Sequence, residues 1–168
     1  MKNKSRTIMI SLFLSACLTF VAVAQGIEEE YSVLKGLKSV KAVFDVRESN
    51  PKSAALHLKL VYDTYKDNNI MAVTKKPDFV VIFMGSSVKL ISKNKEGFSA
   101  EEQKALDEIA TTISKMSKDG MKLEICLFAA KVFGVDSASV LPGIKHVPNG
   151  WVSLIGYEAK GYSLVPVY

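Results

Sequence analysis

The stretch MKLEICLFAAKVFG, residues 121–134, joins a run of strand-forming residues to a short helical run that ends in glycine. Its first eight residues alternate between two faces and predict a strand, and its last six predict a helix. On that strand we expect Glu124, Cys126 and Phe128 to share one side. The stretch therefore predicts a β-α unit, with Cys126 close to the carboxyl end of the strand.

Further units of the same kind lie on both sides of this stretch. Runs rich in β-branched and aromatic residues predict strands, and apolar residues spaced three or four apart predict helices between them. The expected strands are 39–46, 78–85, 121–128, 144–147 and 162–167. The expected helices are 49–67, 99–120, 129–134 and 149–161, of which the second begins with a Ser-x-x-Glu capping box and ends at a glycine. Pro166 places the last strand at an edge, or itself near the strand's end.

This alternation predicts an α/β fold of three layers, with a mostly parallel five-stranded sheet and helices on both faces. Ligand sites in such sheets lie at the carboxyl ends of the strands. Three segments therefore draw attention: MGSS after the second strand, the Cys126 region, and VPNG after the fourth strand. They supply the candidate binding residues Gly85, Ser86, Ser87 and Asn149, and His146, near the end of the fourth strand, is a further candidate.

Residues 1–24 have the pattern of a secretory signal peptide. Three basic residues precede an apolar run over 8–23, which is too short to span a membrane, and Ala-Val-Ala forms a cleavage site that ends at Ala24. LSAC, ending at Cys17, resembles a lipoprotein cleavage site, but it lies in the middle of the apolar run and is the less favoured alternative. We expect a periplasmic or secreted protein with no membrane segment after cleavage.

Removal of the signal changes the charge of the chain. The signal holds three of the 22 Lys and Arg residues and none of the 17 acidic ones, so 19 basic residues remain against 17 acidic, a net charge of +2. Nucleic acid is not an expected partner, because phosphate binding needs a concentrated positive field. The remaining chain predicts a flexible leader over 25–37 and one domain over 38–168.

After cleavage, Cys126 is the one cysteine left in the chain. A single thiol excludes an internal disulfide and a CxxC zinc site, and it makes a thioredoxin-type oxidoreductase a weak third option because the partner cysteine is absent. Two interpretations remain open. The start of the following helix favours a thiolate, which would make Cys126 nucleophilic, whereas apolar surroundings would leave it a buried and inert residue. His146 faces either the same crevice or solvent. With two histidines in the chain, no metal site is expected.

Motifs over the second half of the chain resemble those of the DsrE/DsrF-like family. They are a strand ending in cysteine, a short helix ending in glycine, and then Leu-Pro-Gly, Val-Pro-x-Gly and Gly-Tyr elements. In this sequence they are Cys126, Gly134, Leu141-Pro142-Gly143, Val147-Pro148-Asn149-Gly150 and Gly161-Tyr162. The resemblance continues, less sharply, back to about Lys38.

The resemblance implies a DsrE-like domain of the flavodoxin/Rossmann-like kind that assembles as a homotrimer or hexamer. Cys126 would be its catalytic residue, carrying sulfane sulfur as a persulfide without a cofactor and exchanging it with a donor or acceptor protein or a small thiol. A carrier is expected more than a turnover enzyme. Met84 stands where family members often have a histidine. The alternative function is a non-catalytic oligomeric binding or assembly module with a buried, inert Cys126.

Overall fold

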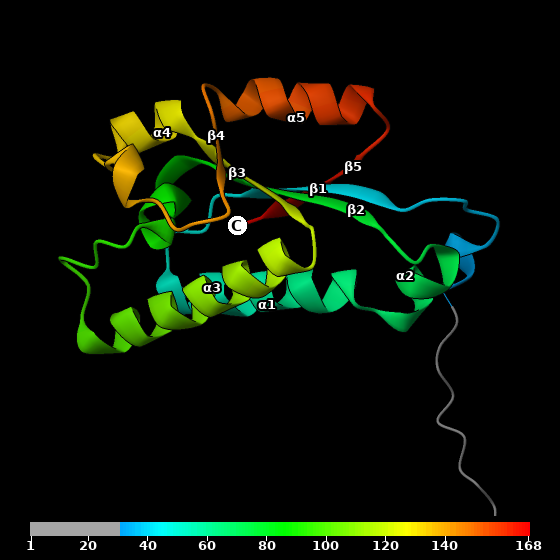
Figure 1. The fold of residues 1–168 in the computed structure, drawn as a ribbon, viewed down its shortest axis with the longest axis horizontal. Helices are drawn as coiled ribbons and strands as arrows, with labels where there is room; N and C mark the ends of the chain where they lie inside the picture. The colour runs from blue at the N-terminus through cyan, green and yellow to red at the C-terminus, as the bar shows by residue number, and fades with distance from the viewer. Residues whose placement is uncertain (1–30) are drawn as a thin grey trace, which may run out of the picture.

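The computed structural model describes residues 31–168, which form a three-layer α/β domain (Figure 1). Its five strands make one sheet in which every pair of neighbours is parallel, in the order β4-β3-β2-β1-β5. The strands are β1 (Lys41–Val46), β2 (Asp78–Phe83), β3 (Lys122–Cys126), β4 (Lys145–Val147) and β5 (Ser163–Val167). The expected α/β fold with a parallel five-stranded sheet is confirmed.

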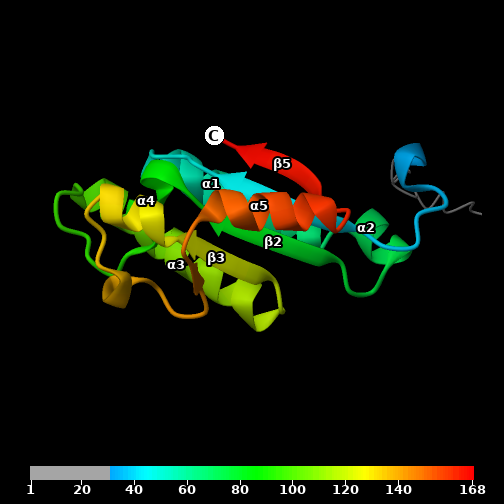
Figure 2. The same ribbon diagram turned by 90° about the horizontal axis from the view of Figure 1, so that it is seen from above.

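Helices cover both faces of the sheet, as predicted. On one face α1 and α3 pack against each other, and on the other α4 and α5 form the third layer (Figures 1 and 2). The helices are α1 (Pro51–Tyr65), α2 (Asn68–Val73), α3 (Ala100–Lys118), α4 (Leu127–Val132) and α5 (Gly150–Ala159).

Local capping sets the start of the long helices. The Asn50 side chain accepts hydrogen bonds from the N–H groups of Lys52 and Ser53, and the predicted capping box between Ser99 and Glu102 is present. The short helix α2, which follows α1 and is capped by the Asp67 carboxylate, was not predicted from the sequence.

The core lies on both faces of β2, the middle strand of the sheet. Every residue from Phe79 to Phe83 is buried there, as expected for a strand that helices cover on both sides. The strand β5 lies at the edge of the sheet beside β1, where Pro166 is tolerated because the outer side of an edge strand needs no ladder hydrogen bonds.

The strand β3 ends earlier than its alternating pattern predicts. It was expected to continue to residue 128, with a helix from 129, but it ends at Cys126 and α4 begins at Leu127. The N–H of Phe128 donates to the carbonyl of Pro148, and that of Ala129 donates to the sulfur of Cys126. Cys126 is consequently the residue that caps α4.

Smaller boundary differences have local causes. The strand β1 begins at Lys41 instead of residue 39, and β5 at Ser163 instead of 162. The strand β2 ends at Phe83 instead of 85, because Gly85 has a φ of 57° and turns the chain into a 3₁₀ helix, Gly85–Ile91.

The predicted signal peptide, 1–24, lies outside the described residues. The predicted leader over 25–37 enters them at Tyr31, and a short 3₁₀ helix, Ser32–Leu34, lies against α2 there. Between residues 31 and 168, none of the helices combines the length and the apolar character needed to cross a membrane.

Candidate functional site

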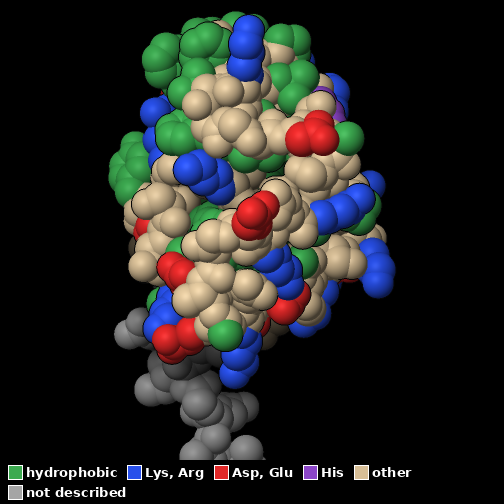
Figure 3. Space-filling view, turned by 90° about the vertical axis from the view of Figure 1, so that its left-hand side faces the viewer, with side chains coloured by type: hydrophobic (Ala, Val, Ile, Leu, Met, Phe, Trp, Pro, Cys, Tyr) green, Lys and Arg blue, Asp and Glu red, His purple; other side chains and the backbone are tan. Residues whose placement is uncertain are grey.

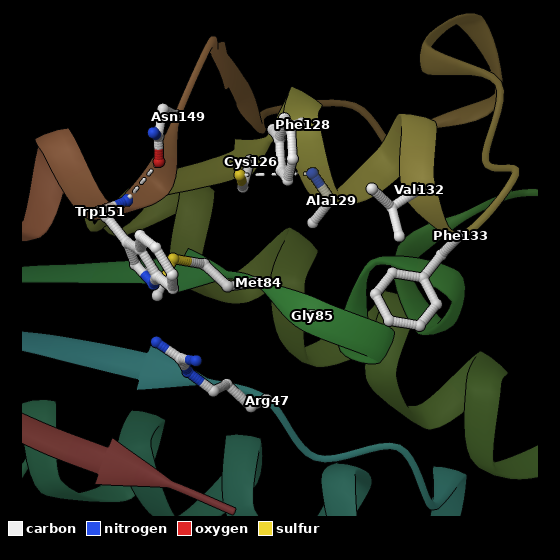
Figure 4. A pocket seen from close by; sticks show the side chains of 10 residues that line it. All are labelled: Arg47, Met84, Gly85, Cys126, Phe128, Ala129, Val132, Phe133, Asn149 and Trp151. Carbon is white, nitrogen blue, oxygen red and sulfur yellow. Dashed lines mark hydrogen bonds between the residues drawn. The ribbon is translucent and has the colours of Figure 1, made fainter.

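A pocket of about 280 Å³ opens where β1, β2 and β3 end, between the starts of α4 and α5 (Figure 4). This is the edge of the sheet at which a ligand site was expected. The pocket is lined by Arg47, Met84, Gly85, Cys126, Phe128, Ala129, Val132, Phe133, Asn149 and Trp151.

Cys126 joins the end of β3 to the start of α4. Its sulfur accepts a hydrogen bond from the N–H of Ala129 at 3.4 Å and so caps the first turn of α4 (Figure 4). The residue is 5% exposed and its accessible surface faces the pocket. It is the one free cysteine among residues 31–168.

The start of α5 lies close above Cys126. A Cβ built on Gly150 would lie 2.4 Å from the sulfur of Met84 and 3.1 Å from the Cβ of Cys126. Real Cβ atoms essentially never come as close to another atom as 2.4 Å, and a contact of 3.1 Å is tighter than most. A glycine is therefore required at the first position of α5 for the helix to lie this near to the cysteine.

Aromatic side chains form much of the pocket wall. Phe128 and Phe133 come from the α4 segment and Trp151 comes from the first turn of α5 (Figure 4). Outside the wall, the ammonium group of Lys89 lies 5.7 Å from the centre of the Phe133 ring, a cation–π distance. The mouth of the pocket thus combines apolar surface with nearby positive charge.

Arg47 is the one charged residue among those that line the pocket, and sequence reasoning missed it. It follows β1 directly, at the same edge as Cys126. Its Nε donates to both carboxylate oxygens of the buried Asp45, at 3.1 and 3.0 Å, which orients the guanidinium. The position of Arg47 one residue beyond a predicted strand end was the available signal.

Of the five predicted binding residues, the pocket brings two together with Cys126. Gly85 and Asn149 both line it, and the Asn149 side chain also accepts the N–H of Trp151. Ser86 and Ser87 are not among the lining residues. The Ser87 hydroxyl is buried and bonds to the carbonyls of Val46 and Met84, so its role is to hold the turn after β2.

His146 lies in β4 and is exposed, and it does not line the pocket either. Its neighbour in the sheet is Ile125, one residue before the cysteine. Among the described residues, no group of three or more His, Cys, Asp or Glu side chains is arranged to hold a metal ion.

A buried carboxylate lies beside Cys126 on the same side of β3, as the alternation predicts. Glu124 accepts a hydrogen bond from the hydroxyl of Tyr157 on α5 at 2.9 Å, and its other oxygen is buried with no hydrogen-bond partner in the described part of the chain. Burial and this bond raise the pKa of Tyr157 to about 12. The contact holds α5 on the sheet.

Apolar side chains also gather around the mouth of the pocket on the α4 and α5 layer. We call this the α4–α5 patch; green side chains gather along the upper edge of the molecule in Figure 3. The patch consists of the exposed residues Phe128, Val132, Trp151, Val152 and Ile155. Exposed apolar groups in such number commonly mark an interaction surface.

Solved structures with the same architecture include two small proteins. One is a protein of unknown function, MTH1491, from Methanobacterium thermoautotrophicum, with a TM-score of 0.58 and 16% identity over 76% of this chain and 99% of that chain. The other is the ychN protein of E. coli, with a TM-score of 0.52 and 14% identity over 76% and 98%. At these identities the likeness supports the fold alone.

Comparison of sequences identifies the family as well as the fold. A protein of Aquifex aeolicus (strain VF5), itself named only as uncharacterized, is 27% identical over 131 residues. The match covers 76% of this chain and 56% of that protein, so the chain spans little more than half the length of this relative. Residues 41–167 match the DsrE/DsrF-like family over nearly the whole described domain. The fold, the cysteine at the end of β3 and this match agree, and the chain belongs to the DsrE/DsrF-like family, which is associated with sulfur relay.

Proposed function

We propose that this protein carries sulfane sulfur as a persulfide on Cys126. The observation that carries the proposal is the position of its sulfur, which lines the pocket and accepts the Ala129 N–H at the start of α4. A thiol that lines an open pocket can be reached by a small sulfur donor, and its thiolate is the form that attacks sulfur. Among the lining residues there is no second thiol or histidine for another reaction of cysteine.

The transfer consists of one displacement. The Cys126 thiol loses its proton to solvent, and the thiolate attacks the outer sulfur of a donor persulfide, R–S–SH. A bond forms between Sγ and that sulfur, the S–S bond of the donor breaks, and R–S⁻ leaves with the electron pair and takes up a proton. The reverse displacement by an acceptor thiol returns Cys126 to its starting state, so the protein is a carrier and needs no cofactor.

A second function is a non-catalytic binding or assembly module. The 5% exposure of Cys126 and the apolar α4–α5 patch favour it, because a buried thiol in apolar surroundings is unreactive and an exposed apolar patch suits association. In that case the protein acts through its surface, and Cys126 is a packing residue.

One experiment separates the two functions. The full chain with Cys17→Ser, in which Cys126 is the one thiol, is incubated with a small persulfide donor, and the intact mass is measured with and without denaturant. A carrier gains one sulfur atom while folded and loses it to an added thiol. A gain that occurs only in denaturant would contradict the carrier and leave the binding module.

Export and assembly complete the proposal. The pattern of 1–24 supports a periplasmic or secreted location, and the α4–α5 patch supports a homo-oligomer, a trimer or hexamer. The mass of the protein recovered from the periplasm or medium tests the first. Cleavage after Ala24 is expected, whereas a lipid-modified Cys17 would indicate the lipoprotein alternative, and an uncleaved chain in the cytoplasm would contradict export.

A further inference from the structure

We infer that the pocket takes a small organic sulfur compound that bears an acidic group, and that Arg47 selects that group. The inference names the substrate class of the proposed carrier and so rests on that function for its sulfur chemistry. Its binding part, an acidic group at Arg47 and an apolar body against the aromatic wall, stands on the pocket itself.

The size of the pocket favours a small molecule. Its volume of about 280 Å³ lies at the low end of the roughly 300–1,000 Å³ that ligand pockets enclose. Cys126 lies inside it, 5% exposed, so a donor must enter past the side chains at the mouth to reach the sulfur. A compact molecule does this more readily than a folded partner.

The walls specify an apolar body. Phe128, Phe133 and Trp151 present ring surfaces, and Met84 presents a thioether, on the path to Cys126 (Figure 4). Flat aromatic or branched aliphatic groups fill such surfaces well, and sulfur contacts aromatic rings favourably. Inorganic sulfur anions alone would leave these walls in contact with water.

The charge specifies an acidic group. The Nε of Arg47 donates its hydrogen bonds to the Asp45 carboxylate. The other N–H groups of the guanidinium have no hydrogen-bond partner in the described part of the chain. No acidic residue lines the pocket, and Lys89 lies nearby against the outer side of Phe133. A planar guanidinium fork recognises a carboxylate or sulfonate by paired hydrogen bonds.

Asp45 limits the strength of this recognition and sharpens its geometry. The buried carboxylate offsets part of the Arg47 charge, and the two bonds to Nε hold the fork in one orientation. Selection therefore depends on hydrogen bonds more than on net charge. We expect a preference of about tenfold for an acid over its amide, which corresponds to roughly 1.4 kcal/mol.

Binding is tested on the unchanged protein through Trp151, the one tryptophan of the chain. Its fluorescence is titrated with 4-nitrobenzoate and with 4-nitrobenzamide, a neutral compound of the same shape. Quenching that saturates at about tenfold lower concentration for the acid supports the inference. Equal concentrations for the two compounds, or quenching that never saturates, would overturn it. Neither result depends on the reactivity of Cys126.

Variants at position 47 assign the preference to the side chain. Arg47→Gln would leave Asp45 buried without its partner and so endanger folding, and the variant Asp45→Asn with Arg47→Gln removes both charges together. A folded double variant should bind the acid and the amide with equal affinity. An intact preference for the acid in that variant would overturn the role of Arg47.

Thiol exchange links binding to sulfur chemistry. With Cys17→Ser, the rate at which Cys126 reacts with 5,5′-dithiobis(2-nitrobenzoate) is compared with that for neutral 4,4′-dithiodipyridine, each relative to a free thiol. A preference of about tenfold for the carboxylate probe supports the inference. Fast but equal reaction overturns it and leaves the carrier, whereas reaction with both probes only in denaturant overturns the carrier itself.

Discussion

Gly150 lies against Cys126 so closely that a Cβ on the glycine would be 3.1 Å from the Cβ of the cysteine. Gly150, the first residue of α5, thus sets how near that helix comes to the end of β3. The depth of the pocket, and the access of any reagent to the sulfur, depend on this contact.

Gly150→Ala should destabilise the fold and change the reactivity of Cys126. The flexible Met84 side chain can move, but the backbone of β3 is buried, so α5 must shift away. We expect a loss of about 1–3 kcal/mol in the free energy of unfolding, as for other overpacked sites. Denaturant unfolding and the alkylation rate of Cys126 measure both effects.

Gly156→Ala is the matched control on the same helix. A Cβ at Gly156 meets nothing within 4 Å, and alanine is favoured over glycine inside a helix by roughly 0.5–1 kcal/mol. This variant should be slightly more stable, with unchanged thiol reactivity. If Gly150→Ala and Gly156→Ala changed the stability and the alkylation rate equally, the contact between Gly150 and Cys126 would not be the cause of the effects.

Tyr157 should make the protein sensitive to alkaline pH. Burial and the bond to Glu124 raise the pKa of Tyr157 from 10.0 to about 12 in the folded state. The folded state holds this proton more tightly, so the stabilisation is complete below pH 10 and is lost as the pH rises towards 12. Tyrosinate absorbance during a pH titration, together with unfolding measured at each pH, checks this.

Tyr157→Phe should remove the contribution of Tyr157 to the alkaline transition, while those of Tyr62 and Tyr162 remain, and should weaken the fold at neutral pH. It leaves the buried carboxylate of Glu124 without its hydrogen bond, at a cost of roughly 1–3 kcal/mol. Glu124→Gln in the same background should recover part of the loss, because a neutral amide is less costly to bury. No recovery would contradict the stranded carboxylate as the cause of the loss, because the substitution removes only the hydroxyl and keeps the aromatic ring.

Asp78 should contribute to acid sensitivity. Burial alone would raise its pKa, but hydrogen bonds from Lys122 and Tyr162 outweigh it and lower the pKa below 3.8. Its stabilisation is therefore present above pH 3.8 and is lost as the pH falls through the lowered folded value. Asp78→Asn should cost roughly 0.5–1 kcal/mol at pH 7, since the pair is partly exposed and screened. The difference from the parent protein should vanish in strong acid.

Ile155→Lys should disrupt self-association if the α4–α5 patch is the oligomer interface. Ile155 on α5 is 67% exposed, so the substitution should leave the fold of the monomer intact. Leu56→Lys is the matched control, because Leu56 is 62% exposed on α1, in the opposite layer. Sedimentation should give smaller particles for the first variant alone. The same oligomer for both variants would exclude this patch as the interface.

The layered fold could be predicted because each element leaves a local pattern. Asn50 and the Ser99–Glu102 capping box mark helix starts, and the apolar run through Phe79 to Phe83 marks a strand covered on both faces. The end of β3 could not be placed in this way, since alternation continues past Cys126. The strand ends because the sulfur of Cys126 accepts the N–H of Ala129 and caps α4, which begins at Leu127.

The sequence by itself determined the alternation of strands and helices, the family motifs and the position of Cys126 at the carboxyl edge of the sheet, because these follow from local periodicity and topology. The tertiary structure alone decided that Arg47, Phe133 and Trp151 meet that cysteine in one pocket and that His146 stays outside it. These residues are brought together by the packing of α4 and α5 on the sheet, and the fit of Gly150 against Cys126 has no signature in any single stretch of the chain.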